Sequence, residues 1–197
     1  MDSKGLVRIK VAIWLQSLEL LGLSCKFFTF KNEAFEGDLA LAAAPLAMPV
    51  ADPGVTAAIH DWLTRFAGCV REVDYAAARP FWHPDIIIFG THQELVRGLT
   101  AWTDTQWDNV WPRTEDFAFD LSNTAVLASP DGAMAVAITP WTSTGFHPDG
   151  TRFGRPGRAT ITLARQPDGS WIGVHSHMSL ARGVPQQSHG NRPVKAR

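Results

Sequence analysis

The feature that most constrains this chain is a Pro-Asp-Gly triplet that occurs three times in its second half. The copies are Pro130-Asp131-Gly132, Pro148-Asp149-Gly150 and Pro167-Asp168-Gly169. Proline presets φ for the second position of a type I turn, aspartate tolerates the third, and glycine adopts the left-handed conformation that follows. Asp-Gly flanked by alternating apolar residues is a strong hairpin signal, so the triplets predict three tight turns between strands.

The segments that flank these turns alternate between apolar and other residues with the two-residue period of a β-strand. The apolar sets of one parity are Phe117, Phe119 and Leu121; Met134, Val136 and Ile138; Ala159, Ile161 and Leu163; and Ile172, Val174, Met178 and Leu180. Residues Thr114 to Arg182 are therefore predicted to form four consecutive antiparallel strands. Because the segments between turns are long, we expect the strands to bend and the sheet to enclose a hollow.

Two helices are predicted ahead of this sheet. Asp52-Pro53 is typical of a helix start, with aspartate as the cap and proline in the first turn. Apolar residues then recur at helical spacing, namely Ile59, Trp62, Leu63, Phe66, Val70 and Val73. This pattern predicts an amphipathic helix with one buried face. Asp74 is expected to cap a second, short helix that ends at Pro80.

A short strand and a third helix complete the predicted order. The strand covers Ile86 to Phe89 and reads as buried on both faces, and the helix begins after Gly98 and ends at Pro112. Trp107 and Trp111 are four residues apart and should share one face of that helix. The order α-α-β-α-β-β-β-β is that of an α+β fold, in which a curved mixed or antiparallel sheet wraps over N-terminal helices.

The two ends of the chain differ from the middle. Residues 1–52 are predicted to be a poorly ordered extension with one marginal helix, because the apolar run from Val11 to Leu23 is too short and too polar to span a membrane. A signal peptide is disfavoured because Glu19 interrupts that run, so we expect a cytoplasmic protein. Residues 53–183 form the predicted domain. Residues 184–197 are polar and are predicted to be a disordered tail.

Composition argues against several classes of function. The net charge is −1 and the pI about 6.6, so no basic footprint for nucleic acid or for an anionic membrane is present. Cys25 and Cys69 lack metal-ligand spacing, and the sequence has no Gly-rich phosphate loop or serine nucleophile elbow. We therefore expect no cofactor and no metal. Eight tryptophans against one tyrosine suit a core, an apolar pocket or an interface.

Several short motifs occur in a characteristic order between Val55 and Arg182. They are Pro-Asp-Ile-Ile-Ile-Phe-Gly-Thr at 84–91, Gly-Leu at 98–99, Gly-Arg-Ala-Thr at 157–160 and Trp-Ile-Gly-Val-His-Ser-His-Met-Ser at 171–179. This arrangement resembles the SnoaL-like branch of the nuclear transport factor 2-like superfamily, which includes ketosteroid isomerase. The last motif is also similar to the association domain of calcium/calmodulin-dependent protein kinases. The resemblance implies a cone that encloses a pocket and dimerises through its outer sheet face.

The resemblance leaves two functional hypotheses open, because this superfamily contains both enzymes and members with no known chemistry. In the first, the domain binds an apolar oxygenated small molecule and carries out cofactor-free proton transfer of the isomerase, dehydratase or cyclase type. In the second, it is a non-catalytic dimerising or ligand-binding module. Ketosteroid isomerase chemistry would need a tyrosine in the first helix, whereas Tyr75 lies beyond that helix's apolar stripe.

Three polar residues are candidates for chemistry. His92 follows the buried strand near the expected mouth of the cone and could act as a general base, with Asp108 or Asp104 as the orienting carboxylate. Arg158 reaches the pocket if its parity partners Thr160 and Thr162 line it, and faces solvent otherwise. The candidate ligand-binding residues are Phe89, Trp107, Trp111, Trp141, Ser176 and Met178.

Alternation along the last predicted strand indicates which of its side chains face the interior of the cone and which face outward. Alternation places Ser176 and Met178 toward the interior, and Trp171, His175 and His177 on the outer face, where a second copy could cover them. Two histidines two residues apart could also bind a metal, but no third ligand with motif spacing accompanies them. The expected partners are a small hydrophobic molecule and a second copy of the chain, with neither nucleic acid nor membrane.

Overall fold

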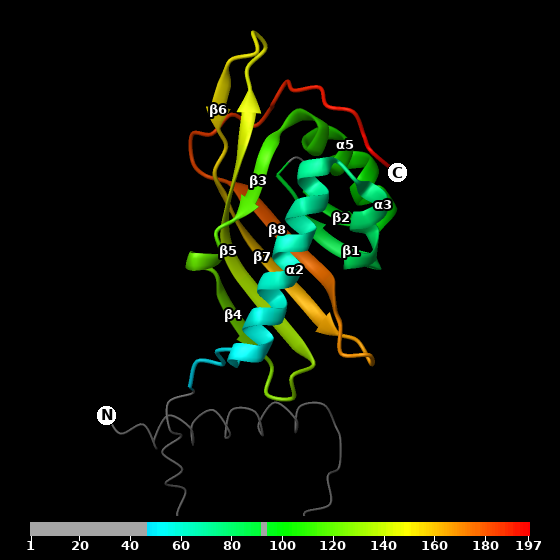
Figure 1. The fold of residues 1–197 in the computed structure, drawn as a ribbon, viewed down its shortest axis with the longest axis vertical. Coiled ribbons are helices and arrows are strands. Elements are labelled where there is room, and N and C mark those ends of the chain that lie inside the picture. The colour runs from blue at the N-terminus through cyan, green and yellow to red at the C-terminus, as the bar shows by residue number, and fades with distance from the viewer. Residues whose placement is uncertain (1–46, 92–93) are drawn as a thin grey trace, which may run out of the picture. The chain divides into compact units, whose positions relative to one another are not determined.

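A long helix lies across one face of a curved eight-stranded sheet (Figure 1). The computed structural model describes residues 47–91 and 94–197, so most of the predicted N-terminal extension and the candidate base His92 lie outside the described residues. The described helices and strands are those of an α+β fold, as predicted from the sequence. None of the described helices is long and apolar enough to cross a lipid bilayer.

The helices that precede the sheet begin where the sequence predicts. Helix α2 (Pro53–Glu72) is capped by Asp52, whose carboxylate accepts hydrogen bonds from the backbone N–H groups of Gly54 and Val55 at 2.7 and 2.9 Å. Asp74 caps α3 (Tyr75–Ala78) in the same way through Ala77, and η1 (Arg79–Phe81) follows. The predicted apolar stripe is the buried face of α2, and it packs on the sheet.

The sheet has the order β2-β1-β8-β7-β5-β3, and β4 and β6 also pair with β5. Its strands are β1 (Trp82–Phe89), β2 (Leu95–Arg97), β3 (Glu115–Phe119), β4 (Ala125–Ala128), β5 (Met134–Phe146), β6 (Arg152–Gly154), β7 (Gly157–Arg165) and β8 (Trp171–Leu180). Only the described pair β1 and β8 runs parallel, and the other pairs are antiparallel. The sheet is therefore mixed, and the predicted fold class is confirmed.

The three Pro-Asp-Gly triplets form the predicted turns. In the last one, the N–H of Gly169 donates to the carbonyl of Gln166 at 2.9 Å, and the glycine has φ of 85°. The Asp168 carboxylate accepts from the backbone N–H and the hydroxyl of Ser170 at 2.9 and 2.7 Å. The other two turns repeat the carbonyl bond and the positive glycine φ. Each turn is therefore closed twice, once by backbone and once by aspartate.

The strands around these turns differ in two ways from the predicted meander. The first predicted strand is two strands, β3 and β4, because η4 (Leu121–Asn123) interrupts the chain between them. The first turn therefore joins β4 to β5. Both β3 and β4 then pair with β5 along different halves of that long strand. The third predicted strand is broken into β6 and β7 at Arg155 and Pro156, where proline has no N–H to donate to a ladder.

The third predicted helix is a continuous helical stretch of varying pitch. It consists of α4 (Leu99–Trp102), the π-helical segment η2 (Thr103–Trp107), α5 (Asp108–Val110) and η3 (Trp111–Arg113). Trp107 and Trp111 stack with ring centroids 4.2 Å apart, which confirms that they share a face. Trp102, Thr103, Gln106 and Trp107 are all buried and face the interior from this stretch.

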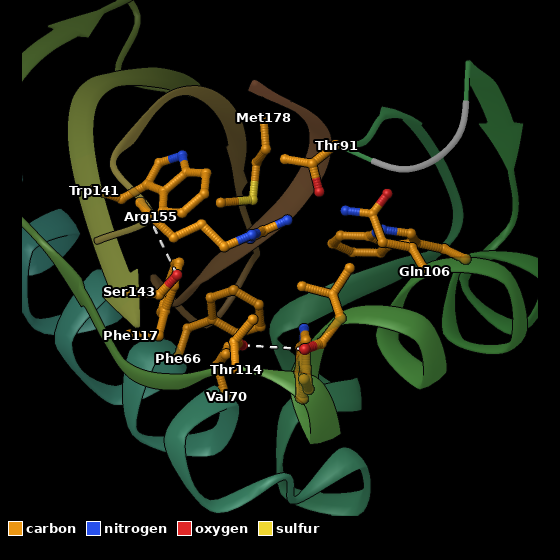
Figure 2. A pocket seen from close by; sticks show the side chains of 13 residues that line it. Phe66, Val70, Thr91, Gln106, Thr114, Phe117, Trp141, Ser143, Arg155 and Met178 are labelled. Atoms are coloured by element: carbon orange, nitrogen blue, oxygen red, sulfur yellow. Dashed lines mark hydrogen bonds between the residues drawn. The ribbon is translucent and has the colours of Figure 1, made fainter. Parts of the chain in front are cut away.

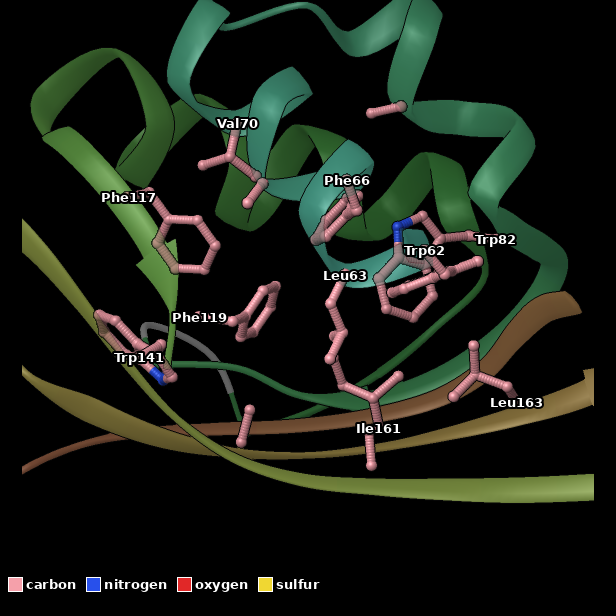
Figure 3. Packing of buried hydrophobic residues seen from close by; sticks show 14 of the residues in the cluster. Trp62, Leu63, Phe66, Val70, Trp82, Phe117, Phe119, Trp141, Ile161 and Leu163 are labelled. Atoms are coloured by element: carbon pink, nitrogen blue, oxygen red, sulfur yellow. The ribbon is translucent and has the colours of Figure 1, made fainter. Parts of the chain in front are cut away.

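Aromatic rings from both the helices and the strands fill much of the space over the inner face of the sheet (Figure 3). Trp82 packs edge-on against Trp62 and Phe66, with centroids 5.0 Å apart in both pairs. Gly173 on β8 makes room for this ring, because a Cβ there would lie 2.3 Å from the indole. Close backbone approach at one glycine thus lets a large ring lie flat against the strand.

The two faces of the sheet are not divided as apolar and polar. On β5 the inner residues include Ala135, Ala137 and Trp141, whereas Met134 and Ile138 face outward and are 43% and 44% exposed. On β1 the residues Ile87 and Phe89 are also exposed, so this strand is not buried on both faces as predicted. The outer face therefore carries several large apolar side chains.

The C-terminal residues 184–197 lie against the domain, although their composition predicts a disordered tail. They form no helix or strand, but Arg192 donates to the carbonyl of Trp111 at 2.9 Å and the N–H of Lys195 to that of Val73 at 3.1 Å. Gly190 approaches Arg113 so closely that a Cβ would lie 2.7 Å from the carbonyl oxygen. Backbone contacts of this kind leave no apolar pattern in the sequence, which explains the difference.

Candidate functional site

A small cavity lies between the helices and the inner face of the sheet (Figure 2). Its free volume is about 30 Å³. The residues that line it are Phe66, Val70, Thr91, Trp102, Gln106, Val110, Trp111, Thr114, Phe117, Trp141, Ser143, Arg155 and Met178. A cavity of this size has room for about two water molecules, so the predicted hollow is largely filled by aromatic side chains.

Arg155 is the only charged residue among the described residues that line this cavity. It lies at the break between β6 and β7, where its backbone exchanges hydrogen bonds with Ser143 at 2.8 and 3.1 Å. This pairing continues the ladder and turns the side chain toward the interior, where the residue is only 3% exposed. The guanidinium lies over the ring of Trp141, 5.9 Å from its centroid.

The guanidinium of Arg155 has no anionic partner among the described residues. Its one hydrogen bond there runs from Nη2 to the backbone carbonyl of Gln186 at 3.4 Å, and Nε has none. Burial lowers the pKa of Arg155 to about 10, and no nearby carboxylate opposes that shift. The group still carries its charge at neutral pH. A buried charge without a partner is costly, so this site is suited to receive an anion.

Gln106 brings a second polar group to the same cavity. It lies on the π-helical segment η2, is 5% exposed, and its amide oxygen has no hydrogen-bond partner among the described residues. The amide oxygen lies against the backbone of Gly90, where a Cβ would come within 1.4 Å of it. Figure 2 shows the amide nitrogen pointing toward the side of the cavity where the guanidinium of Arg155 ends.

A larger chamber adjoins the cavity toward the C-terminal segment. Its free volume is about 270 Å³, and it shares Val110, Thr114 and Arg155 with the inner cavity. Its other lining residues are Asn109, Arg113, Gln186, Gln187, Ser188 and His189. The chamber is polar and lies near the lower end of the roughly 300–1,000 Å³ that is typical of small-molecule pockets. Arg155 thus stands at the junction of a narrow aromatic cavity and a wider polar one.

The predicted ligand-binding residues are divided between the cavity and its surroundings. Trp111, Trp141 and Met178 line the inner cavity. Trp107 is fully buried against Tyr75 and Trp102 and does not line it. Ser176 points inward and is 1% exposed, but it also lies outside the lining. Those two residues belong to the packed core.

Phe89 and Arg158 lie on the outer face of the sheet, which corrects their predicted place in the pocket. Phe89 is opposite His177 in the parallel pair of β1 and β8, so the two side chains share a face, with ring centroids 5.4 Å apart. Arg158 is exposed and donates from Nε to the hydroxyl of Ser179 at 3.1 Å. The inward positions of β7 are those of Ala159 and Ile161.

Asp108 is paired at a distance from the cavity. Its carboxylate accepts from the guanidinium of Arg197 at 2.8 and 3.2 Å, and that guanidinium lies over the ring of Tyr75. Burial raises the pKa of Tyr75, and the Asp108 carboxylate raises it further. Asp108 lines neither chamber, so its described surroundings are those of an ion pair that holds the C-terminus.

The outer face of β8 matches the prediction at the histidines but not at Trp171. His175 and His177 lie opposite Thr162 and Thr160, on the outward parity. A bulge leaves Val174 unpaired and reverses the parity beyond it, so Trp171 lies beside Trp62 and Phe81 on the helix side. Within residues 47–91 and 94–197, no three His, Cys, Asp or Glu side chains converge as metal ligands would.

Sequence reasoning considered Arg158 and missed Arg155. A usable signal was present, because Arg155 shares odd parity with Ala159, Ile161 and Leu163, which face the core. Pro156 hides this signal, because the apparent strand begins only after the proline, at Gly157. Gln106 also had a signal, since it has the i, i+3, i+7 spacing with Thr103 and Val110 that places residues on one helix face, but its polar side chain interrupts the apolar pattern.

Comparison with known proteins agrees with this architecture of helices over a curved mixed sheet, which is that of the nuclear transport factor 2-like fold. Residues 59–183 match the SnoaL-like domain family, and the chain belongs to that family. A search of curated proteins finds no match.

Solved structures of low sequence identity share the fold. An NTF2-like superfamily protein from Salmonella enterica aligns with a TM-score of 0.56 at 20% identity, covering 66% of this chain and 94% of that one. A ketosteroid isomerase-like protein from Erwinia carotovora atroseptica gives 0.56 at 14%, covering 66% and 98%. The CaMKII hub of S. rosetta gives 0.54 at 19%, covering 66% and 98%. At such identities the similarity establishes the fold alone.

Proposed function

We propose that this domain binds a small organic anion, with Arg155 as the group that anchors it. The observation that carries the proposal is a guanidinium that is buried, charged and without a carboxylate partner among the described residues. An arginine in this position is costly to the free protein, and an anionic ligand would offset that cost. The anion replaces the oxygenated apolar molecule expected from the sequence as the ligand class.

The two chambers indicate how such a ligand would lie. The inner cavity has room for little more than the anionic group, whereas the outer chamber of about 270 Å³ has room for a small organic body. Entry would pass the C-terminal segment, because the carbonyl of Gln186 is the group that now contacts the guanidinium. A ligand oxygen would replace that long contact with a shorter, charge-assisted one.

Binding is better supported than catalysis by the described lining. Among the described residues, neither a carboxylate nor an imidazole lines the inner cavity, and His189 is the only titratable base that lines the outer chamber. His92 follows Thr91, which lines the cavity, so proton-transfer chemistry with His92 as the base is a second proposal. Loss of turnover in His92→Ala with unchanged ligand affinity would support catalysis, and equal turnover would contradict it.

The binding proposal can be tested by titration with acetate, benzoate and the neutral isostere benzamide, followed by calorimetry and by tryptophan fluorescence. Trp141 and Trp111 beside the site make fluorescence informative. We expect a carboxylate to bind and benzamide not to bind. Arg155→Met should weaken carboxylate binding at least tenfold. The matched control Arg158→Met removes an outward arginine and should change affinity less than twofold. Equal binding by both variants, or no binding of either carboxylate, would overturn the proposal.

A second candidate function is self-association through the outer face of the sheet. It is favoured by the large apolar side chains exposed there, notably Met134, Ile138 and Phe89. Exposed apolar side chains that gather on one face are typical of a protein-protein contact. A hollow of about 270 Å³ on this face is lined by Ile138, Pro140, Arg158 and His177 among others. We propose that a second copy of the chain covers this hollow, with His175 and His177 at the contact and Trp171 excluded from it.

A further inference from the structure

We infer that Arg155 and Gln106 together form a receptor for a single carboxylate group, and that Gln106 selects a carboxylate over other anions. This inference rests on the proposed anion-binding function and names the chemical group that the site takes. The ligand it defines is a small monocarboxylate, with the carboxylate in the inner cavity and its organic body in the outer chamber.

The guanidinium of Arg155 and the amide of Gln106 point toward the same part of the inner cavity (Figure 2). Both side chains line the same cavity and both are nearly inaccessible, at 3% and 5% exposure. Figure 2 shows the guanidinium of Arg155 and the amide nitrogen of Gln106 both directed toward the side of the cavity near Thr91. Nε of Arg155 and the hydroxyl of Thr91 have no hydrogen-bond partner among the described residues, so an acceptor that enters this space would meet donors from Arg155, Thr91 and the Gln106 amide nitrogen.

The side chain of Gln106 is held in this orientation by the backbone around it. Its amide oxygen lies on the backbone of Gly90, in a space that a Cβ at that residue would occupy. The π-helical segment η2 brings the side chain into the interior without displacing Trp107 from the core. Segments of this kind are frequent at functional sites, because the extra residue redirects side chains. The amide is thus positioned by backbone rather than by a hydrogen-bond partner.

The charge and the size of the inner cavity favour a carboxylate over sulfate or phosphate. The inner cavity presents one cationic group and neutral donors, so it balances one negative charge and not two. Its free volume of about 30 Å³ suits a planar group with two oxygens, which matches the flat guanidinium, better than a tetrahedral sulfate or phosphate. The aromatic walls exclude the water that a dianion would retain.

Gln106→Glu tests the arrangement without requiring the natural ligand. The substitution keeps the shape of the side chain and replaces the amide nitrogen with a carboxylate oxygen, so it supplies the missing anion from the protein itself. We expect the melting temperature of the free protein to rise at pH 7 and the affinity for acetate and benzoate to fall at least tenfold. In the Arg155→Met background, Gln106→Glu should not raise the melting temperature above that of Arg155→Met alone.

Two further variants complete the experiment. Gln166→Glu adds the same charge at an exposed position that lines neither chamber, so it should not raise the melting temperature and should leave the affinity nearly unchanged. Gln106→Met removes hydrogen bonding without adding charge. It should weaken acetate binding about three- to tenfold and reduce the preference for acetate over sulfate, which we expect to be at least tenfold in the wild type.

The outcomes separate this inference from the proposed function. Carboxylate binding that depends on Arg155 but not on Gln106 would leave the proposed function standing and overturn the receptor. A wild-type protein that binds sulfate as tightly as acetate would also overturn it. If the wild type binds no carboxylate, both proposals fail, even where Gln106→Glu gains stability through Arg155. Loss of binding in Gln106→Glu together with a gain in melting temperature that requires Arg155 supports the receptor.

Discussion

Arg155 and Arg158 lie three residues apart in the chain, and their side chains occupy opposite faces of the same sheet. Arg155 is buried in the inner cavity without a carboxylate partner among the described residues, whereas Arg158 is exposed on the outer face and bonded to Ser179. Alternation along a strand requires this division for an odd separation. The pair therefore supplies an internal control, since the same substitution at each position differs only in its environment.

Replacing Arg155 with methionine should stabilise the ligand-free protein. Burial lowers the pKa of Arg155 to about 10 without an opposing carboxylate, which means that the charge is unfavourable in the folded state. An apolar side chain of similar length removes that cost, which is on the order of 1–3 kcal/mol. The melting temperature should rise by roughly 2–8 °C.

Thermal unfolding of Arg155→Met and Arg158→Met at pH 7, without added anions, measures this difference. At a protein concentration low enough for the protein to be monomeric, so that the outer face is free, Arg158→Met should change the melting temperature by no more than about 1 °C, as is usual for exposed positions. A fall in melting temperature for Arg155→Met would mean that the guanidinium is stabilised by contacts other than those described, and would weaken its role as an anion site.

The sequence was informative where local chemistry determines the structure. The caps at Asp52 and Asp74 and the three Pro-Asp-Gly turns follow from residues that interact with their near neighbours, and all were predicted. The site depends instead on long-range events. The bulge at Val174 places Trp171 on the helix side, and the chain break at Pro156 obscures the parity of Arg155. The bulge cannot be recognised from alternation within one strand, and the parity of Arg155 becomes visible only when the alternation is continued back across the proline.

The turn aspartates should make stability sensitive to acid. Hydrogen bonds from the hydroxyls of Ser129, Thr151 and Ser170 lower the pKa of the aspartates in the three turns below the ordinary value of 3.8. A lowered carboxylate pKa stabilises the folded state above pH 3.8, and this contribution is lost as the pH falls through the folded-state values. The urea midpoint should therefore decrease below about pH 4.

Asn in place of Asp isolates this effect, because an amide keeps the oxygen acceptor but does not titrate. The triple variant of Asp131, Asp149 and Asp168 to Asn should unfold at lower urea than the wild type at pH 6, and the gap should narrow toward pH 2.5. An unchanged gap across that range would show that the turns do not depend on the charge.

The C-terminal segment should contribute to stability through the close approach of Gly190. A Cβ at this position would lie 2.7 Å from the carbonyl oxygen of Arg113 and 3.0 Å from the ring of Phe146. Gly190→Ala must therefore displace the segment, and we expect a loss of about 1–3 kcal/mol. Gly154→Ala is the control, because a Cβ there meets nothing within 4 Å. Chemical denaturation of both variants tests the claim, and equal stability would show that the segment is not held at Gly190.

Self-association should depend on the outer face of the sheet and not on the helices. Ile138 is 44% exposed and borders the outer hollow, so a charge there would be buried at a contact between two copies. Ile138→Lys should lower the molar mass measured by light scattering from that of a dimer to that of a monomer. Thr64→Lys adds the same charge on the exposed side of α2 and should leave the dimer intact. Circular dichroism must show that both variants remain folded. A wild type that is monomeric at every concentration tested would refute the interface, and a dimeric Ile138→Lys would move it away from this face.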